Sequence, residues 1–167
     1  MLDNLLEQTK LSAPASHAQA VQALFGPCWH TSPRVDVWTD GSAMHGPNRT
    51  GAGIYYGPNS ARNAAVRVPG TSQTNNRAEL YAVLHVLYHA EPHISLGIHS
   101  DSQYVIHSIC HWATRNAQLG WRCLHGDLLA AMQAILRART APVLFYWVKG
   151  HSGNNNNTTA DELAKQG

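Results

Sequence analysis

The chain has few acidic residues and even fewer lysines. Ten of its 167 residues are Asp or Glu, and the three lysines are Lys10, Lys149 and Lys165, so arginine supplies most of the positive charge. The formal net charge of +2 excludes the broad basic field that holds nucleic acid without other contacts. Because acids are scarce, four of them at one site would dominate the anionic chemistry of the molecule.

Cysteines and long apolar runs are also scarce. Cys28, Cys110 and Cys123 are odd in number and include no close pair, which argues against a disulfide framework or a zinc site and favours a reducing compartment. No apolar run approaches the roughly 18 residues of a membrane span, and the N-terminus lacks a signal-peptide pattern. We therefore expect an intracellular monomer, cytoplasmic or nuclear, with no membrane partner.

The composition is that of a folded protein, with 44% hydrophobic and 13% charged residues. The length suits one domain with a sizeable core. Gly26-Pro27 and Ser32-Pro33 interrupt the helical pattern near the N-terminus. We therefore predict an N-terminal helical leader or linker over residues 1–33 and one main domain over residues 34–167.

Hydrophobic periodicity predicts an alternation of strands and helices in the main domain. Strands are expected at 35–39, 53–56, 64–68, 94–99 and 143–148, and helices at 75–90, 104–110, 127–138 and towards the C-terminus. The run Asn154–Asn157 before the last helix is expected to form a mobile loop. A helix between the third and fourth strands requires a crossover, which indicates an α/β fold with a mixed sheet and helices on its faces.

Four acids stand near the ends of these elements, and each has an ordinary structural explanation. Glu79 follows Asn76 as in a capping box, and Asp161 follows Thr158 in the same way. Asp101 lies near the start of a helix. Asp40 precedes Gly41, a common turn pair.

Taken together, the four acids suggest a metal site. Asp40 and Asp101 follow predicted strands, and the carboxyl ends of parallel strands form the functional edge of such a sheet. Carboxylates at close range repel one another and need a cation. Ligation by oxygen alone favours Mg²⁺ or Mn²⁺ over zinc. Two such ions roughly 3.5–4 Å apart can flank a phosphodiester, activating water on one side and stabilising the leaving oxygen on the other.

The order of several motifs resembles type 1 ribonuclease H over residues 34–167. The matching blocks are Thr39-Asp40-Gly41-Ser42, Thr74 to Leu80, Ser100 to Val105, Trp147 to His151 and Ala160 to Ala164. The resemblance implies a ribonuclease H-like fold, with a mixed five-stranded sheet and helices on both sides. It also implies Mg²⁺-dependent cutting of the RNA strand of RNA–DNA hybrids, with two ions for which Mn²⁺ can substitute.

The resemblance implies a role for each acid. Asp40 would bridge the two ions, Glu79 and Asp101 would complete one site, and Asp161 would complete the other. His151 would assist proton movement or product departure. The substrate contacts that it implies are Gly41, Ser42, Thr74, Asn75, Asn76, Gln103, Trp112 and Trp121. Capping is the alternative role of the asparagines, and core anchoring is the alternative role of the two tryptophans.

Two departures from the family and one further likeness bear on partners. One departure is the N-terminus, which lacks the basic, aromatic hybrid-binding module that some relatives carry. The region that usually carries lysines along the DNA strand offers Arg115 and Arg122 instead. The ending Ala160–Gly167 resembles ribonuclease H domains of retroelement polyproteins, which implies a reverse transcriptase partner in a longer parent chain. The alternatives are a non-catalytic module that binds hybrids and another nuclease, integrase or transposase of the ribonuclease H-like superfamily.

Overall fold

The computed structural model describes residues 34–44, 50–150 and 153–167. All of them belong to Pro33–Gly167, the second of the two units into which the chain divides. The predicted leader, residues 1–33, lies outside the described residues, so its boundary and role stay predictions. Within the described ranges, none of the helices combines the length and the apolar character that crossing a membrane requires.

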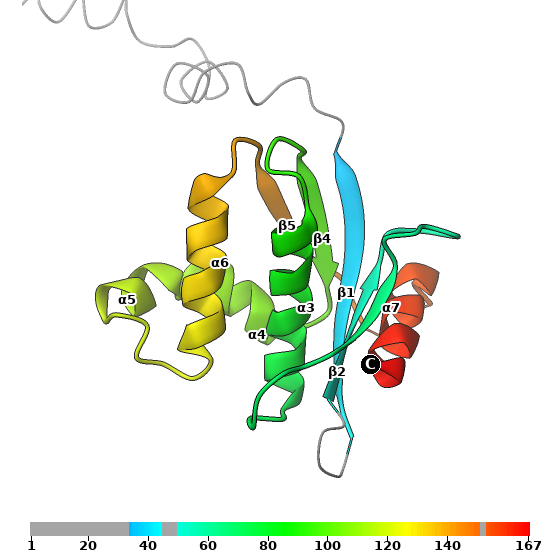
Figure 1. The fold of residues 1–167 in the computed structure, drawn as a ribbon, viewed down its shortest axis with the longest axis horizontal. Coiled ribbons are helices and arrows are strands. Elements are labelled where there is room, and N and C mark those ends of the chain that lie inside the picture. Colours follow the sequence, from blue (N-terminus) through cyan, green and yellow to red (C-terminus); the bar gives the residue numbers. More distant parts are fainter. Residues whose placement is uncertain (1–33, 45–49, 151–152) are drawn as a thin grey trace, which may run out of the picture. The chain divides into compact units, whose positions relative to one another are not determined.

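A five-stranded sheet forms the centre of the described unit (Figure 1). Its strands are β1 (Val35–Ala43), β2 (Thr50–Tyr55), β3 (Ala64–Arg67), β4 (Leu96–Ser100) and β5 (Val143–Trp147), in the order β3-β2-β1-β4-β5. Strand β2 pairs antiparallel with β1 and β3, whereas β4 runs parallel to β1 and β5. The predicted α/β fold with a mixed sheet is therefore confirmed.

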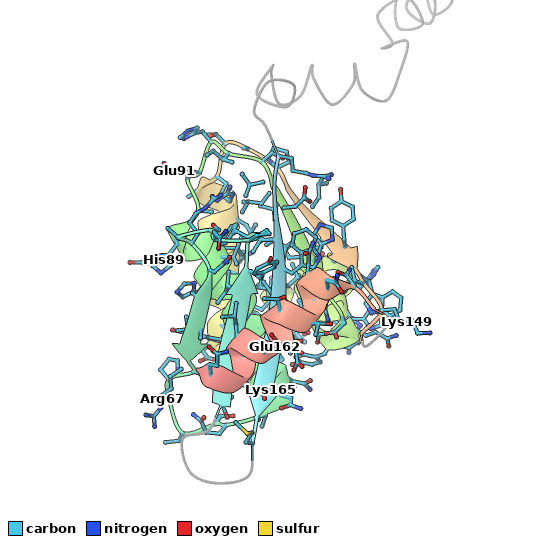
Figure 2. The ribbon with its side chains drawn as sticks, turned by 90° about the vertical axis from the view of Figure 1, so that its right-hand side faces the viewer. Arg67, His89, Glu91, Lys149, Glu162 and Lys165 are labelled. Atoms are coloured by element: carbon cyan, nitrogen blue, oxygen red, sulfur yellow. The ribbon has the colours of Figure 1, made fainter. Side chains whose placement is uncertain are left out.

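Helices cover both faces of this sheet (Figures 1 and 2). Helix α3 (Asn75–His89) packs on β1 and β2, with α6 (Gly126–Ala138) beside it, and α7 (Asn155–Gln166) packs on the opposite face of β1 and β2. Three short segments connect β4 to α6: α4 (Gln103–Ile106), the π-helical η2 (His107–His111) and α5 (Ala113–Gln118).

The core lies between α3 and the sheet. Alternate strand residues such as Val37 and Ile98 point to one face, where they meet Leu80, Val83 and Leu87 of α3, and all five side chains are buried. Burying each of these aliphatic side chains contributes roughly 1.5–3 kcal/mol. The apolar spacing on α3 therefore anchors the helix whose second turn carries Glu79.

Helix α7 can approach β2 closely because β2 contains glycine at the contact. A Cβ added to Gly53 would overlap the backbone oxygen of Ala160. Gly53 is paired with Asp40 in the β1–β2 register. The same close approach therefore brings the residue after Ala160, Asp161, towards the strand that carries Asp40.

A two-bond ion pair joins the starts of α3 and α6. The Nη1 and Nη2 atoms of Arg77 donate to the two carboxylate oxygens of Asp127 at 3.1 and 2.7 Å. This bond raises the pKa of Arg77 and lowers that of Asp127. The Asp127 side chain is 61% exposed, so solvent weakens the pair.

We expect Arg77→Lys to lower the free energy of unfolding by roughly 1 kcal/mol, because lysine cannot form the paired bonds of a guanidinium. Urea denaturation checks this result. The matched control is Arg67→Lys, at an exposed arginine of β3 (Figure 2), which should change stability little. Equal effects of the two substitutions would contradict the role of the ion pair.

Two segments differ from the predicted elements. The run Asn154–Asn157, predicted as a loop, instead begins α7: Asn154 Oδ1 accepts hydrogen bonds from the backbone N–H groups of Asn156 (3.1 Å) and Asn157 (3.3 Å). Asparagine is among the best N-cap residues, so the loop prediction was wrong, and Asp161 lies in the second turn of the helix. The helix predicted over 104–110 is α4 followed by a π-helical turn.

Candidate active site

Three of the four predicted carboxylates meet in space. Asp40, Glu79 and Asp101 each offer one oxygen, and these oxygens lie within 4.8 Å of one another. They come from β1, from α3 and from the residue that follows β4. Residues far apart in the sequence therefore form one acidic cluster at one end of the parallel β1–β4 pair.

Asp40 lies inside β1 rather than at its end, which corrects the prediction from the sequence. The parallel pairing of β1 with β4 ends at Thr39 and Ser100, but the antiparallel pairing with β2 continues to Ala43. Asp40 is therefore the first residue of β1 beyond β4, and this is why it faces Asp101. The backbone N–H of Gly41 donates to Asp40 Oδ1 at 2.7 Å.

Glu79 lies in the second turn of α3, where capping does not explain it. The N-cap is Thr74, whose hydroxyl accepts from the backbone N–H of Arg77 at 3.2 Å. A Cβ added to Gly41 would overlap the Glu79 backbone nitrogen, so glycine lets β1 touch α3 and brings Glu79 beside Asp40. The Glu79 side chain is buried, and its Oε2 atom has no hydrogen-bond partner among the described residues.

Asp101 is held from two sides. The side-chain Nδ2 of Asn157 in α7 donates to Asp101 Oδ2 at 3.0 Å. A Cβ added to Gly150 would overlap the same oxygen. The indole Nε1 of Trp147 donates to the backbone oxygen of Asp101 at 3.1 Å. The carboxylate therefore has little freedom to rotate away from Asp40 and Glu79.

The cluster carries more negative charge than it can hold alone at neutral pH. Burial, followed by the charge of Asp101, raises the pKa of Asp40 from 3.8 to about 7. Burial, followed by the charges of Asp40 and Asp101, raises the pKa of Glu79 well above its ordinary value. In the protein alone these groups therefore retain protons, and a bound cation would release them.

Asp161 lies close to this cluster without belonging to it. Its charge contributes to the raised pKa of Asp40, but its oxygens do not share the 4.8 Å grouping of the other three. Lys165, one turn later in α7, forms an ion pair with Asp161 at 2.5 Å; Figure 2 labels Lys165 on the helix. The structure thus brings three predicted ligands together and places the fourth beside them.

The donor atoms fit a hard divalent cation. All of them are carboxylate oxygens, which suit Mg²⁺ or Mn²⁺. The unpartnered Oε2 atom of Glu79 is buried, and an unsatisfied buried oxygen is costly unless something binds it. A cation between Asp40, Glu79 and Asp101 would satisfy that oxygen and offset the mutual repulsion of the carboxylates.

The remaining predicted site residues differ in how far solvent reaches them. Thr74, Asn75, Asn76 and Gln103 are exposed, and Ser42 is half-buried. Asn75 Oδ1 accepts from the backbone N–H of Ala43 at 2.6 Å, so this side chain has a structural role. His151 lies outside the described residues, and its role stays a prediction.

The two predicted tryptophans differ in environment. Trp112 is 47% exposed. Trp121 is half-buried against the core, and its Nε1 donates to Oε1 of Gln133 in α6 at 3.1 Å. Trp121 therefore holds the segment before α6 against that helix, and Trp112 packs beside the rings of Tyr104 and His107. The substrate contacts of both tryptophans stay predictions.

Asn157 is absent from the site residues that the sequence predicts. The signal that identifies it is its spacing four residues before Asp161, which places both side chains on one face of a helix. That spacing becomes informative only when the helix begins at Asn155, as it does in the structure.

The described unit is a mixed sheet with helices on both faces, and its buried carboxylates lie where the pairing of β1 with β4 ends. These features define a protein of the ribonuclease H-like fold class. The sequence model of the RNase H family matches residues 32–167. The chain therefore belongs to the ribonuclease H family, and it is an enzyme of that family. It is similar to "Ribonuclease H" of Gluconobacter oxydans, with 36% identity over 81% of this chain and 92% of that protein.

Two further comparisons agree. "Ribonuclease H" of Schizosaccharomyces pombe is 33% identical over 81% of this chain and 53% of that protein. The crystal structure of LC9-RNase H1, described as a type 1 RNase H with the type 2 active-site motif, aligns with a TM-score of 0.61. That alignment has 28% identity and covers 81% of this chain and 72% of the other.

Proposed function

We propose that this enzyme hydrolyses the RNA strand of RNA–DNA hybrids with two Mg²⁺ ions, for which Mn²⁺ can substitute. The observation that carries the proposal is the buried cluster of Asp40, Glu79 and Asp101, with its unpartnered Glu79 oxygen. Membership of the ribonuclease H family supplies the substrate class. The nearby Asp161 provides a ligand for a second ion.

Each acid has a place in this proposal that follows from its position. Asp40 shares the oxygen cluster with Glu79 and Asp101, and the charge of Asp161 also raises its pKa, so Asp40 would be a ligand of both ions. Glu79 and Asp101 would hold one ion with it, and Asp161 the other. Ions held by these residues would supply the activation of a water and the stabilisation of the leaving oxygen. His151, which follows β5 in the sequence, would move a proton or assist product departure.

The substrate would be recognised by its shape. A-form helices present a wide, shallow minor groove with 2′-hydroxyls, which proteins contact without reading the sequence. Thr74 and Asn76 at the start of α3 and Gln103 at the start of α4 are exposed and polar, so they suit such contacts. Gly41 and Ser42 continue β1 next to Asp40, and Trp112 suits contact with the DNA strand.

Incubation of the protein with a labelled RNA–DNA hybrid, with and without Mg²⁺, tests this function. Matched RNA and DNA duplexes of the same sequence serve as controls. Cleavage of the RNA strand in the hybrid alone is expected, and only with the metal. Cleavage of duplex DNA instead would favour another nuclease or integrase of the superfamily. Binding without cleavage would favour a non-catalytic hybrid-binding module.

The retroelement origin and the reverse transcriptase partner stay predictions, as do the monomeric state and the intracellular location. Similarity to proteins named Ribonuclease H, one of which is covered to 92% of its length, supports cleavage that needs no attached polymerase. A cleavage assay with and without an added reverse transcriptase distinguishes a retroelement domain from an enzyme that needs no polymerase. Strong stimulation by the polymerase would favour the retroelement origin.

Hybrid binding by this chain alone is expected to be weak and sensitive to salt. Arg115 and Arg122 are the arginines between α4 and α6, a segment with no lysine, and both are exposed. Affinity that depends on a few neutralised phosphates falls on the order of tenfold to a hundredfold between about 50 and 200 mM salt. Fluorescence anisotropy in Ca²⁺ or EDTA measures this slope, which Arg115→Gln should reduce by about one unit. An affinity that hardly changes with salt would contradict the prediction.

A further inference from the structure

One buried amide connects α7 to the acidic cluster. Asn157 lies in the first turn of α7 and is only 3% exposed to solvent. Its side-chain Nδ2 donates to Asp101 Oδ2 at 3.0 Å. Hydrogen bonds to a carboxylate are stronger than those between neutral groups. Gly150 lies so close to the same oxygen that a Cβ added there would overlap it. Asn157 therefore closes the space in which the Asp101 carboxylate could turn.

The other end of the same amide indicates that stability does not explain the residue. Asn157 Oδ1 is buried and has no hydrogen-bond partner among the described residues. An unpaired buried polar atom costs roughly 1–3 kcal/mol. Leucine has a similar size and no polar atom to satisfy. Turning the amide over would place its oxygen against the Asp101 carboxylate, so the donor is directed at Asp101.

The position of Asn157 also bears on the fourth acid. Asn157 and Asp161 are four residues apart in α7, so their side chains lie on one face of the helix. A hydrogen bond from Asn157 to Asp101 thus ties this face of α7 to the end of β4. It thereby sets how far Asp161 stands from Asp40, Glu79 and Asp101.

We propose that Asn157 is a positioning residue for metal binding. It holds the Asp101 carboxylate towards Asp40 and Glu79, and it holds Asp161 at the distance that a second ion needs. Asn157 acts through these carboxylates and contacts neither ion nor substrate. This role rests on the proposed function, because it concerns the ions that the carboxylates would bind.

The test compares Asn157→Leu with Asn155→Leu, the same change at an exposed position of the same helical turn. Mn²⁺ binding is measured by titration calorimetry without any hybrid. Loss of a hydrogen bond to a metal ligand weakens metal affinity about 10–100-fold, and we expect this for Asn157→Leu alone. Cleavage by Asn157→Leu should require more Mg²⁺ and recover as Mg²⁺ rises, with the KM for the hybrid unchanged.

Unaltered Mn²⁺ affinity in folded Asn157→Leu would overturn the proposal. If that variant does not fold, NMR of the unsubstituted protein decides. The Asn157 side-chain NH₂ signals should exchange slowly with water, shift when Mg²⁺ is added, and lose their protection in Asp101→Ala. Signals that exchange freely and ignore Mg²⁺ would overturn it equally. A protein that binds Mn²⁺ but leaves hybrids uncut would contradict the proposed function and not this role of Asn157.

Discussion

Replacing Asp40 by asparagine is expected to lower Mg²⁺-dependent cleavage of RNA–DNA hybrids on the order of a thousandfold, because metal ions contribute several kcal/mol to such reactions. Asp40 is the acid whose pKa depends on each of the other three acids. The amide keeps the shape of the side chain but loses its charge, so neither proposed ion keeps its shared ligand. Single-turnover cleavage at saturating hybrid measures the loss.

The matched control for this substitution is Asp36→Asn. Asp36 lies four residues earlier in β1 and bonds Arg34 and His99 rather than the acidic cluster. Its amide variant should keep cleavage within a few-fold of the unsubstituted enzyme. Hybrid binding, measured without cleavage in Ca²⁺, should survive both substitutions. Near-normal cleavage by Asp40→Asn would rule out the proposed metal assignment.

The metal-free protein is expected to lose stability as the pH rises from about 4 to about 7. The pKa of Asp40 in the folded protein is raised from 3.8 to about 7. A group with a raised folded-state pKa contributes most below its unfolded value, and this contribution disappears as the pH passes the folded value. A shift of this size corresponds to a loss on the order of 4 kcal/mol. Mg²⁺ should reverse the loss, because it binds the ionised carboxylates.

Urea denaturation in EDTA at several pH values measures this effect. The difference between the unsubstituted protein and Asp40→Asn gives the contribution of Asp40 together with its repulsion of Glu79. The subtraction is needed because other groups act in the opposite direction. Burial lowers the pKa of His85 and His125, so their contribution is lost as the pH falls below about 6.5. Parallel pH profiles for the two proteins would contradict the assigned charge repulsion.

The elements that the sequence predicts well are those with a strong local pattern. Helix α3 was expected at residues 75–90 and forms at Asn75–His89, because its apolar residues recur at helical spacing and Thr74 caps it. The crossover between β3 and β4 follows from that helix, and with it the mixed sheet. Local patterns failed at the asparagine run, where the residue type suits both loops and helix caps.

The residues of the acidic cluster could be predicted from the sequence, but their arrangement in space could not. Residue type and order identify Asp40, Glu79, Asp101 and Asp161. They do not show that β1 continues past Asp40 along β2, or that Asp161 stands apart from the other three. The role of Asn157 could not be predicted from the sequence because its partner, Asp101, lies 56 residues away along the chain. A contact across that separation is set by how α7 packs on the sheet.

The sequence by itself determined the class of the fold, the family and the acids available for chemistry, because these depend on periodicity and on the order of short motifs along the chain. Only the tertiary structure decided which carboxylates share a site and which amide holds them. Those outcomes depend on close approaches at Gly41, Gly53 and Gly150, and on burial that raises the pKa of Asp40. The close approaches and the burial both depend on packing between segments that are distant in the sequence, so local sequence patterns do not predict them.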